Sequence, residues 1–134
     1  MFKRIMWATL FVSDQSKALD FYTQAFGFEK RADNPGPEGR FLTIGLPGTD
    51  AEIVLWPGTH GQPTEGTAGA PSTSIPGPLF LESDDLRADV EALRARGVRF
   101  VEPAPEDYTW GVRATALDPD GNRLALRQPN RSRG

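Results

Sequence analysis

The hydrophobic pattern of the first half of the chain changes from a strand-like run to a helical period. The apolar run over residues 5–12 predicts a first buried strand, and Ser13 or Asp14 can cap a helix directly after it. Gly27 stands where a left-handed helix end belongs. One face of this helix is apolar at helical spacing: Ala18, Phe21, Tyr22 and Ala25. Three further strands are expected at about 27–33, 40–46 and 51–56, with a turn over 33–39.

The second half follows the same plan. A strand at 78–83 leads into Asp84 and Asp85, which can cap a second helix that Gly97 ends. The apolar stripe of this helix consists of Leu86, Val90 and Leu93. Strands are expected at about 98–102, 111–118 and 122–128, the last two joined by a tight hairpin over residues 118–122, Asp-Pro-Asp-Gly-Asn.

The order of elements indicates an internal repeat. The acidic cap, helix and terminal glycine of 14–27 recur at 85–97. Between the halves, residues 58–76 lack periodicity and are rich in Gly, Pro, Ser and Thr, which is typical of a linker or long loop. We expect residues 1–134 to form one domain, with a first module at about 1–57 and a second at about 77–130.

Composition narrows the class of protein. The chain has 134 residues and a net charge of −3, and its basic residues are scattered, so neither its charge nor its pattern favours nucleic-acid binding. The absence of cysteine excludes disulfides and thiolate chemistry. The apolar run near the N-terminus is short, lacks a cleavage site and leads straight into a helix start, and no segment is long enough to span a membrane. We therefore expect a cytoplasmic protein without membrane contacts.

Two stretches resemble the signatures of the vicinal-oxygen-chelate superfamily, which includes glyoxalase I, extradiol dioxygenases and bleomycin-resistance proteins. They are LFVSDQSKALDFYTQAFGFE (10–29) and WGVRATALDPDGNRLALRQ (110–128). With the repeat, the resemblance covers nearly the whole chain. It implies an α+β fold in which two βαβββ modules form eight strands, in two curved four-stranded mixed sheets around a cup, with the helices outside. It also implies a small-molecule pocket inside the cup and a homodimer.

The metal-dependent members of this superfamily carry His, Gln or Glu at up to four matching strand positions. Here the resemblance places Trp7, Val54, Pro78 (or Gly77 if the register slips) and Ala125 at those positions. None of these side chains binds a divalent cation. The single histidine, His60, lies in the linker, where a solvated loop residue is favoured over a lone ligand or general base. We therefore expect no metal and no cofactor, which disfavours glyoxalase and dioxygenase chemistry.

Strand alternation suggests which side chains line the pocket. If the metal-equivalent positions point into the cup, the residues two positions away on the same strands point into it as well. Trp110 is expected at the rim, with Arg113 on the same wall. The expected ligand-binding set is Trp7, Thr9, Phe11, Glu52, Val54, Trp56, Phe80, Glu82, Trp110, Arg113, Arg123, Ala125 and Arg127. Aromatic faces in such a set can stack on a planar or cationic ligand. Plain core packing is an equal alternative for Trp7, and an ion pair with a neighbouring arginine is the favoured alternative for Glu82.

Four functions follow from these residues. The first is a metal-free small-molecule-binding protein that holds a partly aromatic ligand. The second is a metal-independent isomerase or lyase in which Glu82 or His60 moves protons, with Glu82 as the catalytic candidate. A metalloenzyme with misassigned ligands and a dimeric interaction module without a small ligand are the remaining two. The sequence leaves open whether the chain is an enzyme.

Overall fold

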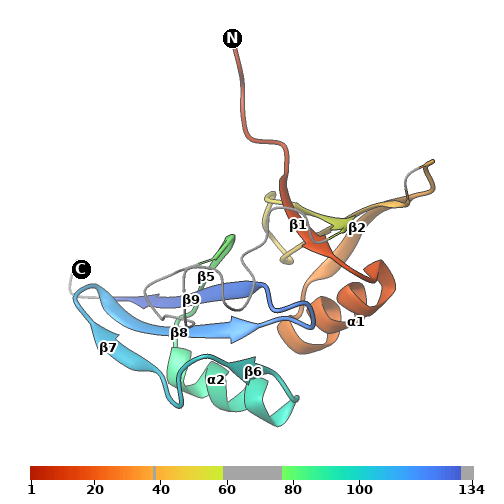
Figure 1. Cartoon of the computed structure of the whole chain (residues 1–134). Helices are drawn as coiled ribbons and strands as arrows, with labels where there is room; N and C mark the ends of the chain where they lie inside the picture. The colour runs from red at the N-terminus through yellow and green to blue at the C-terminus, as the bar shows by residue number, and fades with distance from the viewer. Residues whose placement is uncertain (38, 59–76, 131–134) are drawn as a thin grey trace. The chain divides into compact units, whose positions relative to one another are not determined.

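The chain folds into two compact units, residues 1–62 and 63–134, and each unit combines one mixed sheet with one helix (Figure 1). The computed structural model describes residues 1–37, 39–58 and 77–130. Within these residues there are two helices and two open sheets of four and five strands, so the expected α+β fold is confirmed. No helix in this described part is long and apolar enough to cross a membrane.

The first unit has the strand order β1-β4-β3-β2. Parallel pairing joins β1 to β4, whereas β3 is antiparallel to both of its neighbours. A parallel neighbour requires a crossover, and the chain makes it through α1, β2 and β3 before it returns in β4. The elements are β1 (Ala8–Val12), α1 (Gln15–Phe26), β2 (Glu29–Asn34), β3 (Phe41–Gly45) and β4 (Ile53–Pro57).

The ends of α1 are set by local chemistry. The side chain of Asp14 accepts a hydrogen bond from the backbone N–H of Lys17 at 3.0 Å, and Gly27 ends the helix in the left-handed region at φ 80°. Three of the four residues of the predicted apolar face, Ala18, Tyr22 and Ala25, are buried, and the fourth, Phe21, is half-buried. They pack against one face of the sheet, whose alternate positions are buried: Leu10, Val12, Leu42, Ile44, Ile53 and Leu55. Each fully buried aliphatic side chain contributes about 1.5–3 kcal/mol.

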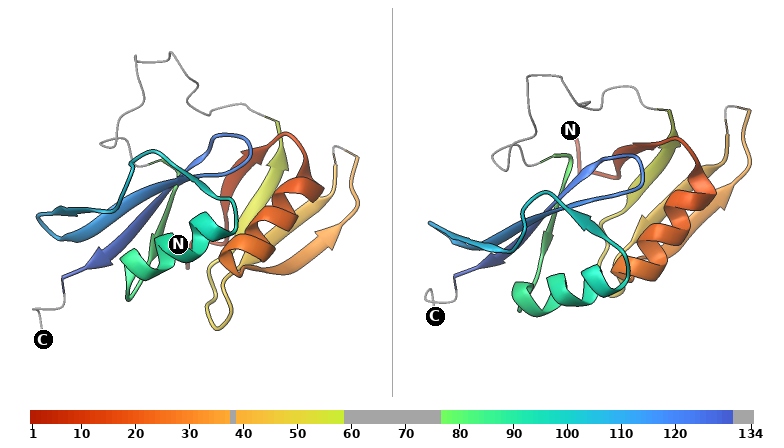
Figure 2. Two further views of the ribbon diagram at one scale, coloured as in Figure 1. Left: turned by 90° about the horizontal axis from the view of Figure 1, so that it is seen from below. Right: turned by 60° about the horizontal axis from the view of Figure 1, so that its bottom comes forward.

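The second unit repeats this plan with the strand order β5-β9-β8-β6, and β7 pairs with β8 as an additional strand. As in the first unit, the first strand is parallel to the last, and the helix crosses over one face of the sheet (Figure 2). The apolar stripe of this helix, Leu86, Val90 and Leu93, is buried as predicted. The elements are β5 (Leu79–Glu82), α2 (Leu86–Ala95), β6 (Arg99–Phe100), β7 (Glu106–Tyr108), β8 (Gly111–Leu117) and β9 (Arg123–Pro129).

The hairpin between β8 and β9 is closed by the side chain of Asp118. One carboxylate oxygen accepts from the backbone N–H groups of Asp120 and Asn122, and the other accepts from the Asn122 amide. Gly121 takes a φ of 84°, the conformation for which the sequence predicted glycine. At the start of β8, a Cβ on Gly111 would lie 2.0 Å from the carbonyl oxygen of Gln128, so only glycine allows this strand pair to close.

The structure differs from the sequence prediction at three strands. β1 begins at Ala8 rather than at residue 5, because its partner β4 begins at Ile53 and offers no ladder beyond it. β6 has two residues, since Glu102 turns inward and prolines follow at 103 and 105. β7 was not predicted, and it makes the second sheet five-stranded rather than four-stranded. The predicted linker lies outside the described residues apart from its first residue.

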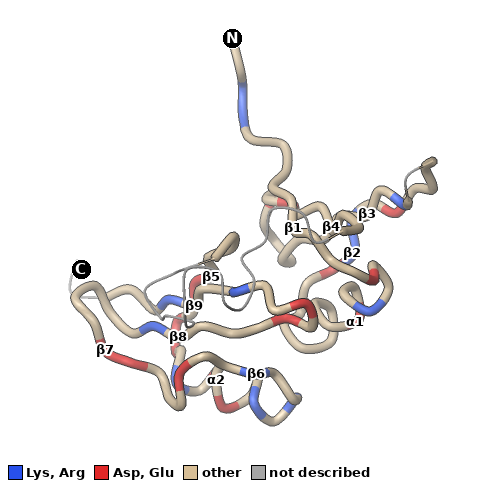
Figure 3. The backbone as a smooth tube through the Cα atoms, viewed as in Figure 1, with Lys and Arg blue, Asp and Glu red and all other residues tan. Residues whose placement is uncertain are grey.

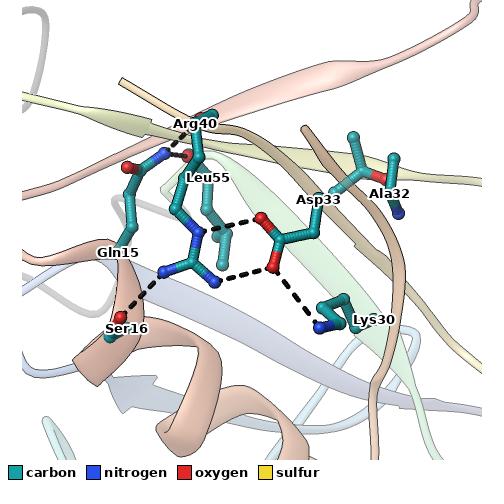
Figure 4. A network of polar contacts seen from close by, with 8 residues as sticks. Gln15, Ser16, Lys30, Ala32, Asp33, Arg40 and Leu55 are labelled. Atoms are coloured by element: carbon teal, nitrogen blue, oxygen red, sulfur yellow. Dashed lines mark hydrogen bonds and ion pairs between the residues drawn. The ribbon is translucent and has the colours of Figure 1, made fainter. Parts of the chain in front are cut away.

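A polar network fastens α1 to its sheet (Figure 4). The Arg40 guanidinium makes two hydrogen bonds to the Asp33 carboxylate, at 2.9 and 3.0 Å, and a third to the Ser16 hydroxyl at 2.7 Å. The Gln15 amide donates to the carbonyl oxygens of Arg40 and Leu55. The first turn of the helix is therefore tied to both β3 and β4.

Replacing Asp33 by Asn is expected to destabilise the protein at neutral pH but not in acid. The hydrogen bond from Arg40 lowers the pKa of Asp33 below its ordinary value of 3.8. A carboxylate with a lowered folded-state pKa contributes stability above its unfolded pKa and loses it as the pH falls through the folded value. We expect the difference in the free energy of unfolding between variant and wild type to shrink as the pH falls from neutral to about pH 2. Urea unfolding at several pH values measures this difference. Asp20→Asn, at an exposed position on α1, is the control, and an equal loss of stability in both variants would contradict this account.

A buried carboxylate, Glu102, organises the second unit. Its side chain is only 3% exposed. It accepts from the backbone N–H of Thr115 at 2.7 Å and from the Thr115 hydroxyl at 2.9 Å. These bonds attach the segment after β6 to the middle of β8, next to the backbone hydrogen bond that the N–H of Val101 donates to the carbonyl oxygen of Thr115.

Replacing Glu102 by Gln is expected to lower the free energy of unfolding by about 1–3 kcal/mol, because the Gln amide keeps only one acceptor oxygen and turns an NH2 group toward one of the two donors of Thr115. Thr115→Val should cost about 1 kcal/mol, since it removes one of the two donors. Glu91→Gln on the exposed side of α2 should stay within about 0.5 kcal/mol of wild type. Urea unfolding followed by circular dichroism measures all three, and an unchanged Glu102→Gln variant would refute the assigned role.

Candidate functional site

Each sheet has one face covered by its helix and one face that the helix leaves uncovered, here called the open face. Side chains alternate between the two faces, so strand register fixes which residues share the open face. In the first unit, Val54 lies between Thr9 and Thr43 on neighbouring strands. In the second unit, the equivalent Ala125 lies between Phe80 and Thr115. The pairing therefore places the candidate residues of each unit's strands on one face.

Trp7 lies at the end of the first unit's open face. Its indole N–H donates to Oε1 of Glu52 at 3.1 Å, and its ring meets the edge of Phe41 at a centroid distance of 5.1 Å. The hydrogen bond fixes the orientation of a ring that is still 41% exposed. Trp7 is thus held at the surface rather than packed in the core.

A hollow of about 410 Å³ lies beside this tryptophan, entirely within the first unit. Arg31 shapes its wall by donating to the carbonyl oxygens of Leu46 and Thr49, while its Nη1 lies 3.8 Å from Oε2 of Glu52. The lining residues are Arg4, Met6, Trp7, Arg31, Asp50 and Glu52. Sequence reasoning found only Trp7 and Glu52 among these, because the others lie outside the strand positions that it considered.

The second unit places two candidate arginines next to each other. Arg113 and Arg127 are direct cross-strand partners on β8 and β9. The Arg127 guanidinium lies over Phe80, at 5.2 Å, and over Tyr108, at 5.6 Å, while that of Arg113 lies over Tyr108 at 5.2 Å. Trp110 meets the edge of the Tyr108 ring at 5.9 Å and is 70% exposed. The open face here is therefore both aromatic and cationic.

The positive charges of this face are only partly compensated. Nε of Arg113 lies 3.5 Å from Oε1 of Glu106, which is an ion pair, but this buried N–H makes no hydrogen bond within the described residues. An unsatisfied buried donor costs about 1–3 kcal/mol. Figure 3 shows basic positions along β8 and β9 and acidic positions on β7. Tyr108 and Glu106 were not predicted, because the two prolines at 103 and 105 conceal the short strand that carries them.

The remaining candidates differ in accessibility. Glu82 is exposed and lies opposite Arg127 in the strand register, yet it has no ion-pair partner within 4.0 Å among the described residues. Thr9 is exposed, Phe11 and Trp56 are half-buried, and Arg123 is half-buried at the start of β9. Phe41, which sequence reasoning missed, alternates with Thr43 on β3, so the same alternation could have identified it.

The residues at the expected metal positions do not fit a metal. Trp7, Val54 and Ala125 offer no side-chain ligand of the kind that divalent cations prefer, and Pro78, just before β5, offers none either. In the part of the chain that the structure describes, no three His, Asp or Glu side chains converge on one point. His60 lies outside the described residues.

Comparison with known proteins agrees with the fold. A family model described as the Glyoxalase/Bleomycin resistance protein/Dioxygenase superfamily matches residues 4–126. TnmS3, an antibiotic binding protein from Streptomyces sp. CB03234, is 36% identical in sequence to this chain. Its crystal structure aligns over 96% of this chain and 98% of the TnmS3 chain, with a TM-score of 0.75. A superfamily member from Sphaerobacter thermophilus is 34% identical, with coverage of 95% and 98% and a TM-score of 0.72.

A sequence relative covers the chain equally well. The protein YetH of Bacillus subtilis is 29% identical over 129 residues, which are 96% of this chain and 100% of YetH. The family model, which matches residues 4–126, covers both helices and all the strands except the last three residues of β9. The chain therefore belongs to the Glyoxalase/Bleomycin resistance protein/Dioxygenase superfamily.

Proposed function

We propose that this protein binds a small organic molecule with a flat aromatic part, and that it does so without a metal ion. The observation that carries the proposal is the set of large aromatic side chains left uncovered on or beside the open faces. Trp7 is 41% exposed, Phe80 57% and Trp110 70%. Contiguous exposed apolar groups mark interaction sites in soluble proteins, and within the second unit Phe80 and Trp110 both border the cluster of Tyr108 and Arg127.

The chemistry of these positions supports a ligand with a π-face. The Trp7 ring is oriented by Glu52, and the Phe80 and Tyr108 rings are in contact with Arg127. Flat rings held in fixed positions offer large contact areas at little cost in conformational entropy. Polar groups beside them, such as Glu52 and Arg113, can fix the orientation of a bound molecule.

The relatives support the same kind of function. TnmS3 is described as an antibiotic binding protein, and this chain shares 36% of its residues over nearly the full length of both. We extend to this chain only the general property, which is the binding of a small organic molecule. We also propose that the protein is located in the cytoplasm.

A homodimer is part of the proposal. The N-terminal segment exposes Met1, Phe2, Ile5 and Met6 to solvent in the single chain. Apolar residues exposed in this way gain stability when a second copy covers them. Native mass spectrometry of protein purified without added metals reports the subunit number and any retained organic molecule. A monomer across micromolar concentrations would contradict the dimer.

The binding proposal predicts saturable shifts in amide NMR spectra when a neutral planar probe, 2-naphthamide, is added. The shifts should concentrate in the strands that carry an open face. Trp7→Ala or Phe80→Ala should weaken binding by about 2- to 10-fold, since an aromatic contact contributes about 0.5–1.5 kcal/mol. The affected variant identifies which face carries the probe.

The control for this experiment is Phe26→Ala, which removes a half-buried aromatic ring on α1, the helix on the opposite side of the first sheet, and should leave the affinity unchanged. Unsaturable shifts, or equal affinity in all three variants, would overturn the proposed function. If the protein converts a bound ligand chemically and Glu82→Gln abolishes that conversion, the binding function is replaced by the second candidate, a metal-independent enzyme.

A further inference from the structure

We infer that the open face of the second unit selects ligands that carry an oxyanion beside their aromatic ring, and that Arg127 and Arg113 bind this group. The inference deepens the proposed function and rests on it. The ligand class is a planar aromatic acid, in which a carboxylate or phosphate oxygen projects from the ring system.

Two positive charges face each other across the strand pair β8 and β9. Arg113 and Arg127 are direct partners across an antiparallel strand pair, and both guanidinium groups lie over the ring of Tyr108, at 5.2 and 5.6 Å. Like charges directly opposite each other destabilise a sheet. A bound anion between these two groups removes the repulsion, so the pair is suited to bind one.

The guanidinium groups of Arg127 and Arg113 have few hydrogen-bond acceptors near them. Within the described residues, Arg127 donates only to the carbonyl oxygen of Leu126, at 3.0 Å, and has no carboxylate within 4.0 Å. Nε of Arg113 is buried without a hydrogen bond. The two nearby carboxylates, Glu82 and Glu106, accept no hydrogen bond from either guanidinium, although Glu106 lies 3.5 Å from Arg113. A ligand cannot reach the buried Nε, but Arg113, whose side chain is 29% exposed, and the half-buried Arg127 can donate to a ligand oxygen through their Nη groups.

Two aromatic rings lie beside the Arg127 guanidinium. Its central carbon lies over the Phe80 ring at 5.2 Å and over the Tyr108 ring at 5.6 Å, which is within cation–π distance of both. The edge of a guanidinium presents paired N–H groups that match the two oxygens of a carboxylate or phosphate. Because Phe80 is more than half exposed, the aromatic part of the same ligand can stack beside it.

The test compares three probes that share one ring system: 2-naphthoate, 2-naphthyl phosphate and the neutral 2-naphthamide. We expect the better anion to bind at least about tenfold more tightly than the amide, since charge-assisted hydrogen bonds are the stronger ones. The preferred anion distinguishes a planar carboxylate from a tetrahedral phosphate. The advantage should fall as salt is added, because charge attraction is screened. These comparisons use the wild-type protein and do not depend on the folding of any variant.

Variants assign the effect to the two arginines. Arg127→Gln and Arg113→Gln should each remove most of the preference for the anion, measured within each variant as the ratio of its affinities for the anion and for 2-naphthamide. Arg127→Lys keeps the charge but not the paired donors, so it should restore only part of the preference. Arg96→Gln, an exposed position at the end of α2, removes the same charge and should change nothing. Melting curves establish that each variant is folded.

The outcomes separate the two proposals. If 2-naphthamide binds saturably and neither anion binds more tightly, the oxyanion site is refuted and the binding function stands. The same conclusion follows if Arg96→Gln reduces the anion preference as much as Arg127→Gln does. If no probe binds at all, the binding function fails, and the oxyanion site fails with it.

Discussion

The packing of one helix against one face of each sheet is the constraint on which the rest of this structure depends. Alternate positions of β1, β3 and β4 are buried under α1, and those of β8 and β9 under α2. Because side chains in a strand alternate between faces, burying one set commits the other set to the open face. The helix does not cover the open face, whose central residues such as Val54 and Ala125 are nevertheless buried, whereas Phe80 nearer its edge stays exposed.

The two units share a topology but not the chemistry of their open faces. Their strand orders are equivalent, and Thr43 on β3 matches Thr115 on β8 in register with Val54 and Ala125. The surrounding chemistry nevertheless differs. The first unit combines Trp7 with an acidic partner, Glu52, whereas the second combines Phe80 and Tyr108 with two arginines. One topology therefore supports two different surfaces.

Membership of a superfamily that includes glyoxalases and dioxygenases does not by itself assign their chemistry. Two of the four positions at which the family resemblance implies metal ligands hold Val54 and Ala125, which are buried apolar residues at the centre of each sheet. Neither side chain can coordinate an ion. Under the proposed function, the neighbouring aromatic and arginine side chains are the groups that contact the ligand.

Much of the fold could be predicted from the sequence, because its signals are local. The acidic caps Asp14 and Asp85 and the hairpin glycine Gly121 act within a few residues, and the structure contains them as predicted. Alternation along the strands likewise predicted which residues share a face. Prediction was weaker where pairing is non-local: β1 is short because β4 begins late, and β7 exists only because β8 extends far enough to pair with it.

The sequence by itself determined the α+β class, the helix ends and the side-chain alternation, since each depends on backbone preferences and short-range spacing. Only the tertiary structure decided which side chains meet. It brought Arg127 over Phe80 and Tyr108, and it bonded Trp7 to Glu52 across 45 residues. Contacts of this kind depend on strand register and on the reach of long side chains. Neither property is written in any single stretch of the chain.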